Sequence, residues 1–179
     1  MEQQKESFVE QTLVVLKPDT VQRGIAGEII TRFEKAGLKI VGMKMVAPDE
    51  KHFHEHYEGI SQLISRWGEE IYRITLSHMT EGPVVALVLE GVEAVEHVRK
   101  MVGATDPKDS APGTIRGDYT HVTRNFTNSR GGTLPNILHA SGDKTEAEKE
   151  IALWFDKTDI YSYTTATEST VHGRVPEKK

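Results

Sequence analysis

Two short apolar runs limit most narrowly what this chain can fold into. They are TLVVL at residues 12–16 and VVALVL at residues 84–89, and turn-forming residues follow or precede each of them. Runs of this length, rich in β-branched side chains, are typical of buried strands. Several segments between and after them have helical spacing of apolar residues. The sequence therefore predicts a sheet of buried strands with helices packed on it.

The remaining elements follow from apolar periodicity and from glycine and proline stops. Ile25, Ile29 and Phe33 recur at helical spacing, and Gly37 ends that helix. The order of elements is β-α-β, further helix, then β-α-β. We therefore expect an α/β (α+β) fold of the ferredoxin-like βαββαβ type, in which helices cover a four-stranded antiparallel sheet. The other expected elements are a strand at 38–47, helices from Pro48 and over 58–81, a helix at 92–102, an ordered loop at 104–118, a strand at 118–122, and a helix from Asp143 or Thr145 to about Trp154.

Composition excludes several classes of protein. The 179 residues suit one domain, and the absence of cysteine excludes disulfides, thiol nucleophiles and cysteine-based metal sites. A formal net charge of −5 argues against a general nucleic-acid binder. The N-terminal stretch has no apolar run suited to a secretory signal, and the longest apolar run is too short to cross a bilayer. We expect a soluble, cytoplasmic protein with no membrane or specific nucleic-acid partner.

One short motif matches a metal site in form. HFHEH fits the inverted zinc-peptidase pattern H-x-x-E-H through His52, Glu55 and His56. On a helix the two histidines would lie one turn apart and could hold zinc for a metal-dependent hydrolase. The alternative is a solvated helix face rich in charged residues, and we favour it. No P-loop, dinucleotide-binding or serine-hydrolase motif occurs in the chain.

Several cationic side chains point instead toward phosphate chemistry. Lys17 ends the first strand, Arg99 lies near the end of a helix, and Arg116 lies in the sequence PGTIRGD. Each of them alone is as compatible with a solvated charge. His139 is one of eight histidines, so its position alone does not identify it as functional.

Taken together, four long phrases carry a family resemblance. VVLKPDTVQRGIAGEIITRFEKAGLKIVGMKM, GPVVALVLEG, VRKMVGATDPKDSAPGTIRGDY and NILHASGDKTEAEKEIALWF resemble the nucleoside diphosphate kinase family in the same order. The resemblance implies a kinase domain at 12–155, with insertions at about 58–76 and 120–135. Residues 1–11 would form an N-terminal extension and 156–179 a C-terminal tail, which we expect to be mobile from residue 164.

The resemblance also implies an activity and its central residues. Members of the family move the γ-phosphoryl group of a nucleoside triphosphate to a histidine and then to a nucleoside diphosphate. His139 matches that nucleophile, and Glu150 matches the glutamate that accepts a hydrogen bond from the other ring nitrogen. A carboxylate there would fix the ring and offset positive charge as the N–P bond forms. The other residues expected in catalysis are Lys17, Asn136 and Ser141.

The expected nucleotide site is built from the matching positions of the family. The residues are Lys17, Tyr57, Ile71, Arg99, Thr105, Arg116 and Asn136, with Arg116 expected to hold phosphate through two parallel N–H donors. Mg²⁺ is the expected cofactor, bound through the nucleotide phosphates and not by a protein metal site. The partners implied are nucleoside diphosphates and triphosphates, and further copies of the chain in a hexamer or tetramer.

Three departures from the family pattern stand out. Ile71 falls where a phenylalanine usually stacks on the base, and Ala140 replaces a glycine after the nucleophile. The inserted loop 120–135 carries Arg124 and Arg130, which are either solvated charges or side chains that close over the nucleotide. The alternative function for the whole chain is a catalytically silent relative that binds nucleotides or partners, and the presence of His139 argues against it.

Overall fold

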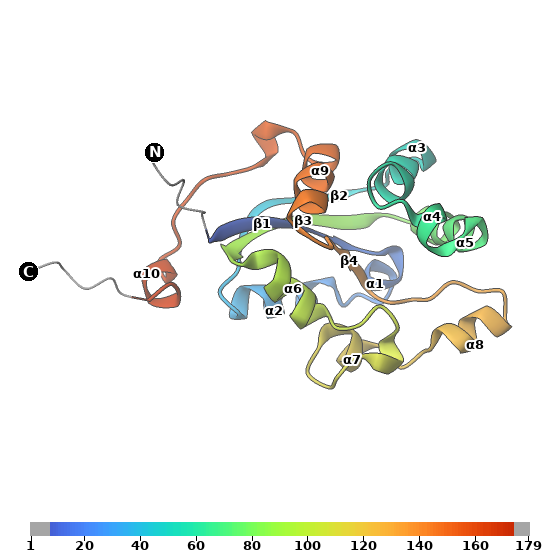
Figure 1. Ribbon diagram of the computed structural model, residues 1–179. Helices are drawn as coiled ribbons and strands as arrows, with labels where there is room; N and C mark the ends of the chain where they lie inside the picture. The colour runs from blue at the N-terminus through green and yellow to red at the C-terminus, as the bar shows by residue number, and fades with distance from the viewer. Residues whose placement is uncertain (1–7, 174–179) are drawn as a thin grey trace, which may run out of the picture.

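The computed structural model describes residues 8–173, and its centre is one four-stranded antiparallel sheet. The strands are β1 (Val9–Leu16), β2 (Lys39–Val46), β3 (Val84–Val92) and β4 (Leu138–Ala140), in the order β2-β3-β1-β4. Val14 pairs with Leu87 of β3 and with Ala140 of β4 on the opposite edge. Figure 1 shows this sheet between layers of helices. The expected ferredoxin-like fold is confirmed.

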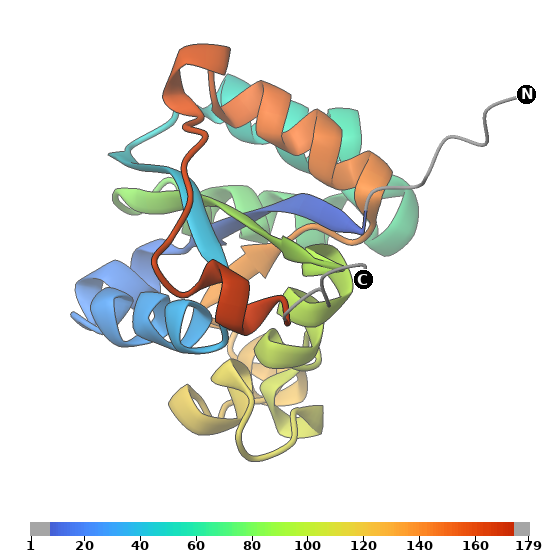
Figure 2. The same ribbon diagram turned by 90° about the vertical axis from the view of Figure 1, so that its left-hand side faces the viewer.

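Helices cover both faces of the sheet, as the continuous apolar runs require. Their bounds are α1 (Pro18–Gln22), α2 (Ala26–Lys35), α3 (Glu50–His54), a π-helical turn at Glu55–Ile60, α4 (Leu63–Trp67), α5 (Glu69–Met79), α6 (Ala94–Val102), α7 (Ile115–Tyr119), α8 (Arg124–Ser129), α9 (Lys144–Trp154) and α10 (Glu168–Val171). Figure 2 shows α9 lying across one face of the sheet while α2 and α6 lie against the other.

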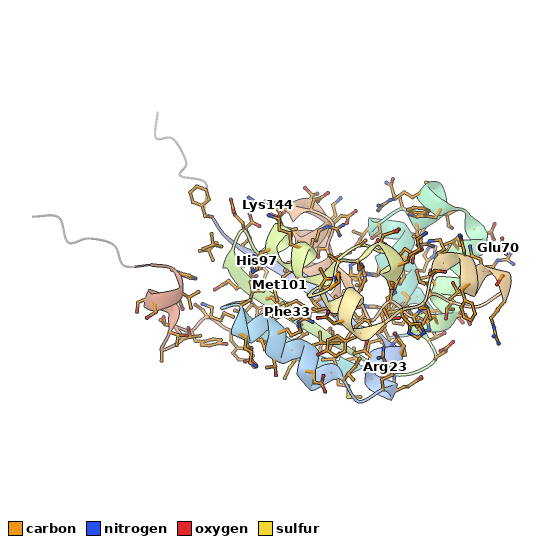
Figure 3. The ribbon with its side chains drawn as sticks, turned by 90° about the horizontal axis from the view of Figure 1, so that it is seen from below. Arg23, Phe33, Glu70, His97, Met101 and Lys144 are labelled. Carbon is orange, nitrogen blue, oxygen red and sulfur yellow. The ribbon has the colours of Figure 1, made fainter. Side chains whose placement is uncertain are left out.

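Alternate residues of the central strands supply the two halves of the core. Val14 and Leu16 pack with Phe33 of α2 and Val98 of α6. Leu13 and the other residues that face the opposite side pack with α3, α5 and α9. Figure 3, seen from the side of α2 and α6, places Phe33 beside Met101. Because both faces are buried, β1 and β3 contain almost no polar side chains in their central parts.

The last expected strand was placed wrongly. Residues 118–122 were expected to form it, but Asp118 and Tyr119 belong to α7, which Thr114 caps by accepting a hydrogen bond from the Gly117 N–H. The edge strand is β4, which follows the segment 120–135 that was expected to be an insertion. Thr114 is a favourable N-cap residue, so the residues after it form a helix. The segment DYTHV is too short for its pattern of apolar residues to distinguish a helix from a strand.

The helix expected over 58–81 is interrupted. A π-helical turn ends at Ile60, Gln62 adopts φ +50°, and Gly68 separates α4 from α5 with φ +90°. The expected ordered loop at 104–118 also contains a short 3-10 turn and most of α7. By contrast, Asp143 caps α9 as expected, because its side chain accepts a hydrogen bond from the Glu146 N–H.

The segment after α9 lies along the outer strand β2. Tyr161 N–H donates to the Val41 carbonyl at 2.8 Å, and the Tyr163 hydroxyl donates to the Ile40 carbonyl at 2.7 Å. Within the tail that was expected to be mobile from residue 164, residues 168–171 form α10; residues 174–179 lie outside the described part of the chain. Among the described residues, no helix combines the length and the apolar character needed to cross a membrane.

Candidate active site

His139 lies in the middle of β4, opposite Val15 of β1. Its Nε2 is 2.9 Å from Oε1 of Glu150, which lies on α9. A carboxylate can only accept a hydrogen bond, so in the neutral imidazole Nε2 carries the proton and Nδ1 keeps its lone pair. The side chain is 16% exposed, whereas Glu150 is fully buried behind it. Nε2 is therefore held by a hydrogen bond, and Nδ1 keeps an unprotonated lone pair.

Both carboxylate oxygens of Glu150 accept hydrogen bonds. The Ser141 hydroxyl donates to Oε2 at 2.6 Å, and the Leu13 N–H of β1 donates to that hydroxyl at 3.2 Å. Burial alone would raise the pKa of Glu150, but His139 and the Ser141 hydroxyl hold it well below its usual range. The carboxylate is therefore ionised, and its charge faces the ring of His139.

A second histidine, which the sequence placed in a zinc motif, supports the first. The ring of His56 meets that of His139 edge to face, with centroids 4.5 Å apart. The Trp154 Nε1–H donates to Nδ1 of His56 at 3.2 Å. Burial lowers the pKa of His56 to about 3, so this imidazole is neutral. It provides a rigid wall for His139 without adding positive charge.

The H-x-x-E-H motif is not a metal site in this arrangement. It is not the solvated helix face that we favoured either, because Phe53 and His56 are fully buried. His52 packs its ring against Trp154, with centroids 4.5 Å apart, while His56 turns toward His139. Within residues 8–173, the one cluster with the composition of a metal site is His56, His139 and Glu150. Its ligand atoms already bond one another or Trp154.

The chain enters β4 through a strained residue. Ile137 has φ +73°, a backbone conformation that a β-branched residue rarely adopts. The Asp19 carboxylate accepts from its N–H at 3.3 Å, and the Thr20 hydroxyl donates to its carbonyl. The His78 ring in turn lies 3.3 Å from Asp19. Asp19 and Thr20 therefore hold the backbone that leads to His139. The positive-φ conformation of Ile137 that they stabilise costs about 1–3 kcal/mol. Ala140, by contrast, is not in the positive-φ region, so its methyl group causes no backbone strain.

Lys17 and Asn136 form the polar floor beside His139. Lys17 Nζ donates to Oδ1 of Asn136 at 2.6 Å, and Nδ2 of Asn136 donates to the Thr105 carbonyl at 3.0 Å. Burial, together with the positive charge of Arg116, lowers the pKa of Lys17 from 10.5 to about 8. The charged form of this lysine is therefore costly in these surroundings, and a neighbouring anion would stabilise it.

Arg116 binds backbone carbonyls with most of its donors. Nε donates to Asn136 at 3.0 Å, Nη2 donates to Leu138 at 2.6 Å, and Nη1 reaches the carbonyls of Gly103 and Ala104. A guanidinium has five N–H groups. The expected pair of parallel donors to phosphate is therefore not free in this state, and Arg116 joins the His139 strand to the loop after α6.

The residues expected to bind nucleotide surround one cavity of about 470 Å³. Glu150 and Ser141 lie behind His139 instead, where they bond each other and the ring. The hydroxyl of Tyr57 is buried and has no hydrogen-bond partner among the described residues, and burial raises its pKa. The expected residues that line the cavity are Lys17, Tyr57, Ile71, Arg99, Thr105, Arg116, Asn136 and His139.

Sequence reasoning missed other residues of this region. Trp67 and Ser61 line the cavity, and Trp154 and Asp19 support it from behind. Trp67 falls within the helix expected over 58–81, where its apolar side chain indicates helix packing and not a ligand contact. The roles of Trp154 and Asp19 could not be inferred from sequence patterns, because they depend on contacts between segments far apart in the chain.

Comparisons with known proteins show the family of the chain. A family model described as nucleoside diphosphate kinase matches residues 10–160. The nucleoside diphosphate kinase of Pyrococcus furiosus is 49% identical over 160 residues, which cover 89% of this chain and 91% of the relative.

Two solved structures extend the comparison to the fold. The nucleoside diphosphate kinase of Borrelia burgdorferi, described as a transition state mimic with bound vanadate and ADP, has a TM-score of 0.88 at 37% identity and covers 91% of this chain and 96% of its own. The enzyme of Halobacterium salinarum, in complex with CDP, has a TM-score of 0.76 at 40% identity, with 90% and 97% covered.

The lowered pKa of Lys17 predicts proton uptake when an anion binds. A phosphate group beside the ammonium raises this pKa above 8, so binding of ADP at pH 8.5 should take up roughly 0.7 of a proton per site. Calorimetric titrations in two buffers of different ionisation enthalpy measure this number. Lys17→Met should abolish the uptake. Binding without proton exchange at pH 8.5 would mean that Lys17 does not meet the phosphates.

The carbonyl contacts of Arg116 predict a structural cost for Arg116→Lys. Lysine cannot reach all four carbonyls, and each buried carbonyl left unpaired costs roughly 1–3 kcal/mol. We expect the free energy of unfolding to fall by at least about 2 kcal/mol in urea titrations. Arg23→Lys is the matched control, because Arg23 is exposed and donates to a single carbonyl, that of Tyr119. Equal stability of Arg116→Lys and the native chain would show that these contacts contribute nothing.

Proposed function

Since the chain belongs to the nucleoside diphosphate kinase family, we propose that Nδ1 of His139 carries the phosphoryl group between the two nucleotides. The chain is a phosphotransferase that moves the terminal phosphoryl group of a nucleoside triphosphate to a nucleoside diphosphate. The observation that carries the proposal is the bond between Nε2 and Glu150, which leaves Nδ1 as the unprotonated nitrogen of a ring that borders the cavity.

In the first half of the reaction, the lone pair of Nδ1 attacks the γ-phosphorus and the bond to the bridging oxygen breaks. The nucleoside diphosphate leaves with that electron pair. The ring gains positive character, which the ionised Glu150 offsets through the Nε2–H hydrogen bond. In the second half, an oxygen of the acceptor diphosphate attacks the same phosphorus, and the neutral imidazole is restored. This ping-pong sequence needs a single nucleophile.

Three of the cationic side chains that line the cavity, Lys17, Arg99 and Arg116, support binding of the phosphates. A transferring phosphoryl group spreads negative charge over its oxygens, so placed countercharge is the main contribution that such a site can make. The unpartnered hydroxyl of Tyr57 and the amide of Asn136 are suited to donate further hydrogen bonds. We assign Thr105 to the same phosphate contacts and Ile71 to the base.

Magnesium fits the site through the substrate. The charged side chains that line the cavity near His139 are mainly cationic. The two carboxylates in the lining already accept hydrogen bonds from the backbone: Asp143 from the Glu146 N–H, and Glu146 from the Gly142 N–H. Mg²⁺ would therefore be held by the phosphate oxygens that Lys17 and the arginines bind, and it would supply charge neutralisation there. No protein carboxylate need leave its present partner.

The exposed face of β2 supports a homo-oligomer. This strand ends the sheet, and its Met43 and Met45 side chains are 59% and 60% exposed. Two large apolar side chains on one face of an edge strand favour contact with another copy of the chain. We further propose that the chain assembles as a hexamer or tetramer, that its kinase domain spans residues 12–155, and that it is located in the cytoplasm. The alternative of a silent relative has no support in the site, whose nucleophile and orienting acid are in contact.

The proposal is tested by charging the enzyme without an acceptor. Native protein mixed with γ-labelled ATP and Mg²⁺ should take up label that is acid-labile and alkali-stable, as a phosphohistidine is. His139→Gln should take up none and should lose turnover by at least roughly 10⁴-fold, as expected on removing a covalent nucleophile. Normal turnover in His139→Gln would sink the proposal. His97→Gln, a change on α6 outside the cavity lining, controls for the loss of an imidazole.

A further inference from the structure

The two inserted segments meet at the cavity, and we propose that Trp67 and Arg124 form a base-stacking subsite for the nucleotide. The guanidinium carbon of Arg124 lies 5.5 Å from the centroid of the Trp67 ring. Trp67 is the last residue of α4 and Arg124 the first of α8, so residues from separate insertions form the contact. Figure 1 shows α4 and α8 at the same end of the molecule, on opposite sides of it. The inference rests on the proposed function, since it assigns the base end of the same nucleotide.

Both side chains line the same cavity as His139. Trp67 is nevertheless 55% exposed, which leaves much of a large aromatic surface accessible. The backbone N–H of Arg124 donates to the Asp106 carboxylate at 3.1 Å, and Thr123 caps its helix. The base of the arginine side chain is thereby fixed, while the guanidinium is held mainly by the indole. Such a contact can be exchanged for one with a ligand.

The chemistry of the cavity separates into a phosphate end and an apolar end. Lys17, Asn136 and Arg116 gather beside His139. The segment 58–76 instead contributes the apolar side chains of Leu63, Trp67, Ile71 and Ile74 to the lining, with Arg66 as its one charged group there. A nucleotide has the same polarity, with phosphates at one end and a flat heterocycle at the other. Once the phosphates are at His139, the base is the part that the apolar end can accept.

Stacking explains why an isoleucine at position 71 is tolerated. Ile71 can cover a base by apolar contact but has no π surface, whereas the Trp67 indole does. Arg124 adds a planar cation that stacks on aromatic rings and bases. In this chain the aromatic contact is thus supplied from four residues earlier, at the end of α4.

The present spacing between Arg124 and Trp67 is too short for a base to lie between them. Stacked planes lie roughly 3.5 Å apart, so a base between the two groups needs about 7 Å. At 5.5 Å the guanidinium occupies part of that space. The base therefore displaces the guanidinium from the indole, stacks on the indole itself, and receives Arg124 on its other face. The buried hydroxyl of Ser61, which lines the cavity and has no partner among the described residues, offers a polar contact in the same cavity.

Calorimetry tests the subsite. The native chain and its variants are titrated with ADP and with inorganic pyrophosphate, both in the presence of Mg²⁺. Trp67→Ala should weaken ADP binding roughly tenfold, in line with the loss of one stacked base, and Trp67→Phe should retain most of the affinity. Trp67→Ala should weaken CDP binding less than ADP binding, because the cytosine ring is smaller than adenine. Pyrophosphate has no base, so its affinity should not change. Arg124→Ala should weaken ADP binding more than pyrophosphate binding.

The chain contains its own control pair. Arg130 lies 5.5 Å from the ring of Phe126 on α8, and neither residue lines the cavity. Phe126→Ala and Arg130→Ala should leave ADP affinity unchanged. Native ADP affinity in Trp67→Ala, or equal losses for ADP and pyrophosphate, would overturn the inference. Because binding is measured without transfer, a failure here is distinct from a failure to form phosphohistidine at His139.

Discussion

The hydrogen bond between His139 and Glu150 is the interaction on which the rest of the site depends. It joins the edge strand β4 to α9, which lies across the sheet, and it decides which ring nitrogen is free. The carboxylate can stay ionised in a fully buried position because Ser141 satisfies its other oxygen. A buried charge is tolerated only when it is paired and hydrogen-bonded, and here the pairing group is also the nucleophile that we propose.

The surrounding fold holds a short and strained strand in place. β4 has three residues, and it is reached through Ile137 in a positive-φ conformation. Asp19 of α1 accepts a hydrogen bond from the Ile137 N–H, and Arg116 of α7 donates to the carbonyls of the residues on each side, Asn136 and Leu138. Arg116 therefore has a positioning role in the empty enzyme in addition to the phosphate contact proposed for it. The same cation would have to give up carbonyl partners to bind phosphate with two donors.

The apolar runs at 12–16 and 84–89 predicted the central strands, because strands buried on both faces leave a strong local signal. The order of the helices and strands around them predicted the ferredoxin-like fold. β4 was missed because its three residues contain a histidine and are paired on one side only. The nucleotide-site residues were identified by resemblance, and the cavity contains them. The contact between Trp67 and Arg124 could not be predicted, because it depends on how two insertions fold against each other. His56 had been noticed for the wrong reason: its motif suggested zinc, while its burial against Trp154 makes it a wall of the site.

The most direct measurement of the central claim is the position of phosphorus on the ring of His139. Enzyme labelled with ¹⁵N in histidine and charged with ATP would be observed by ³¹P and ¹⁵N NMR. The geometry predicts phosphorus coupled to Nδ1, with the proton retained on the nitrogen that faces Glu150. Coupling to Nε2 would contradict the account, because that nitrogen could be phosphorylated only if its bond to Glu150 were broken.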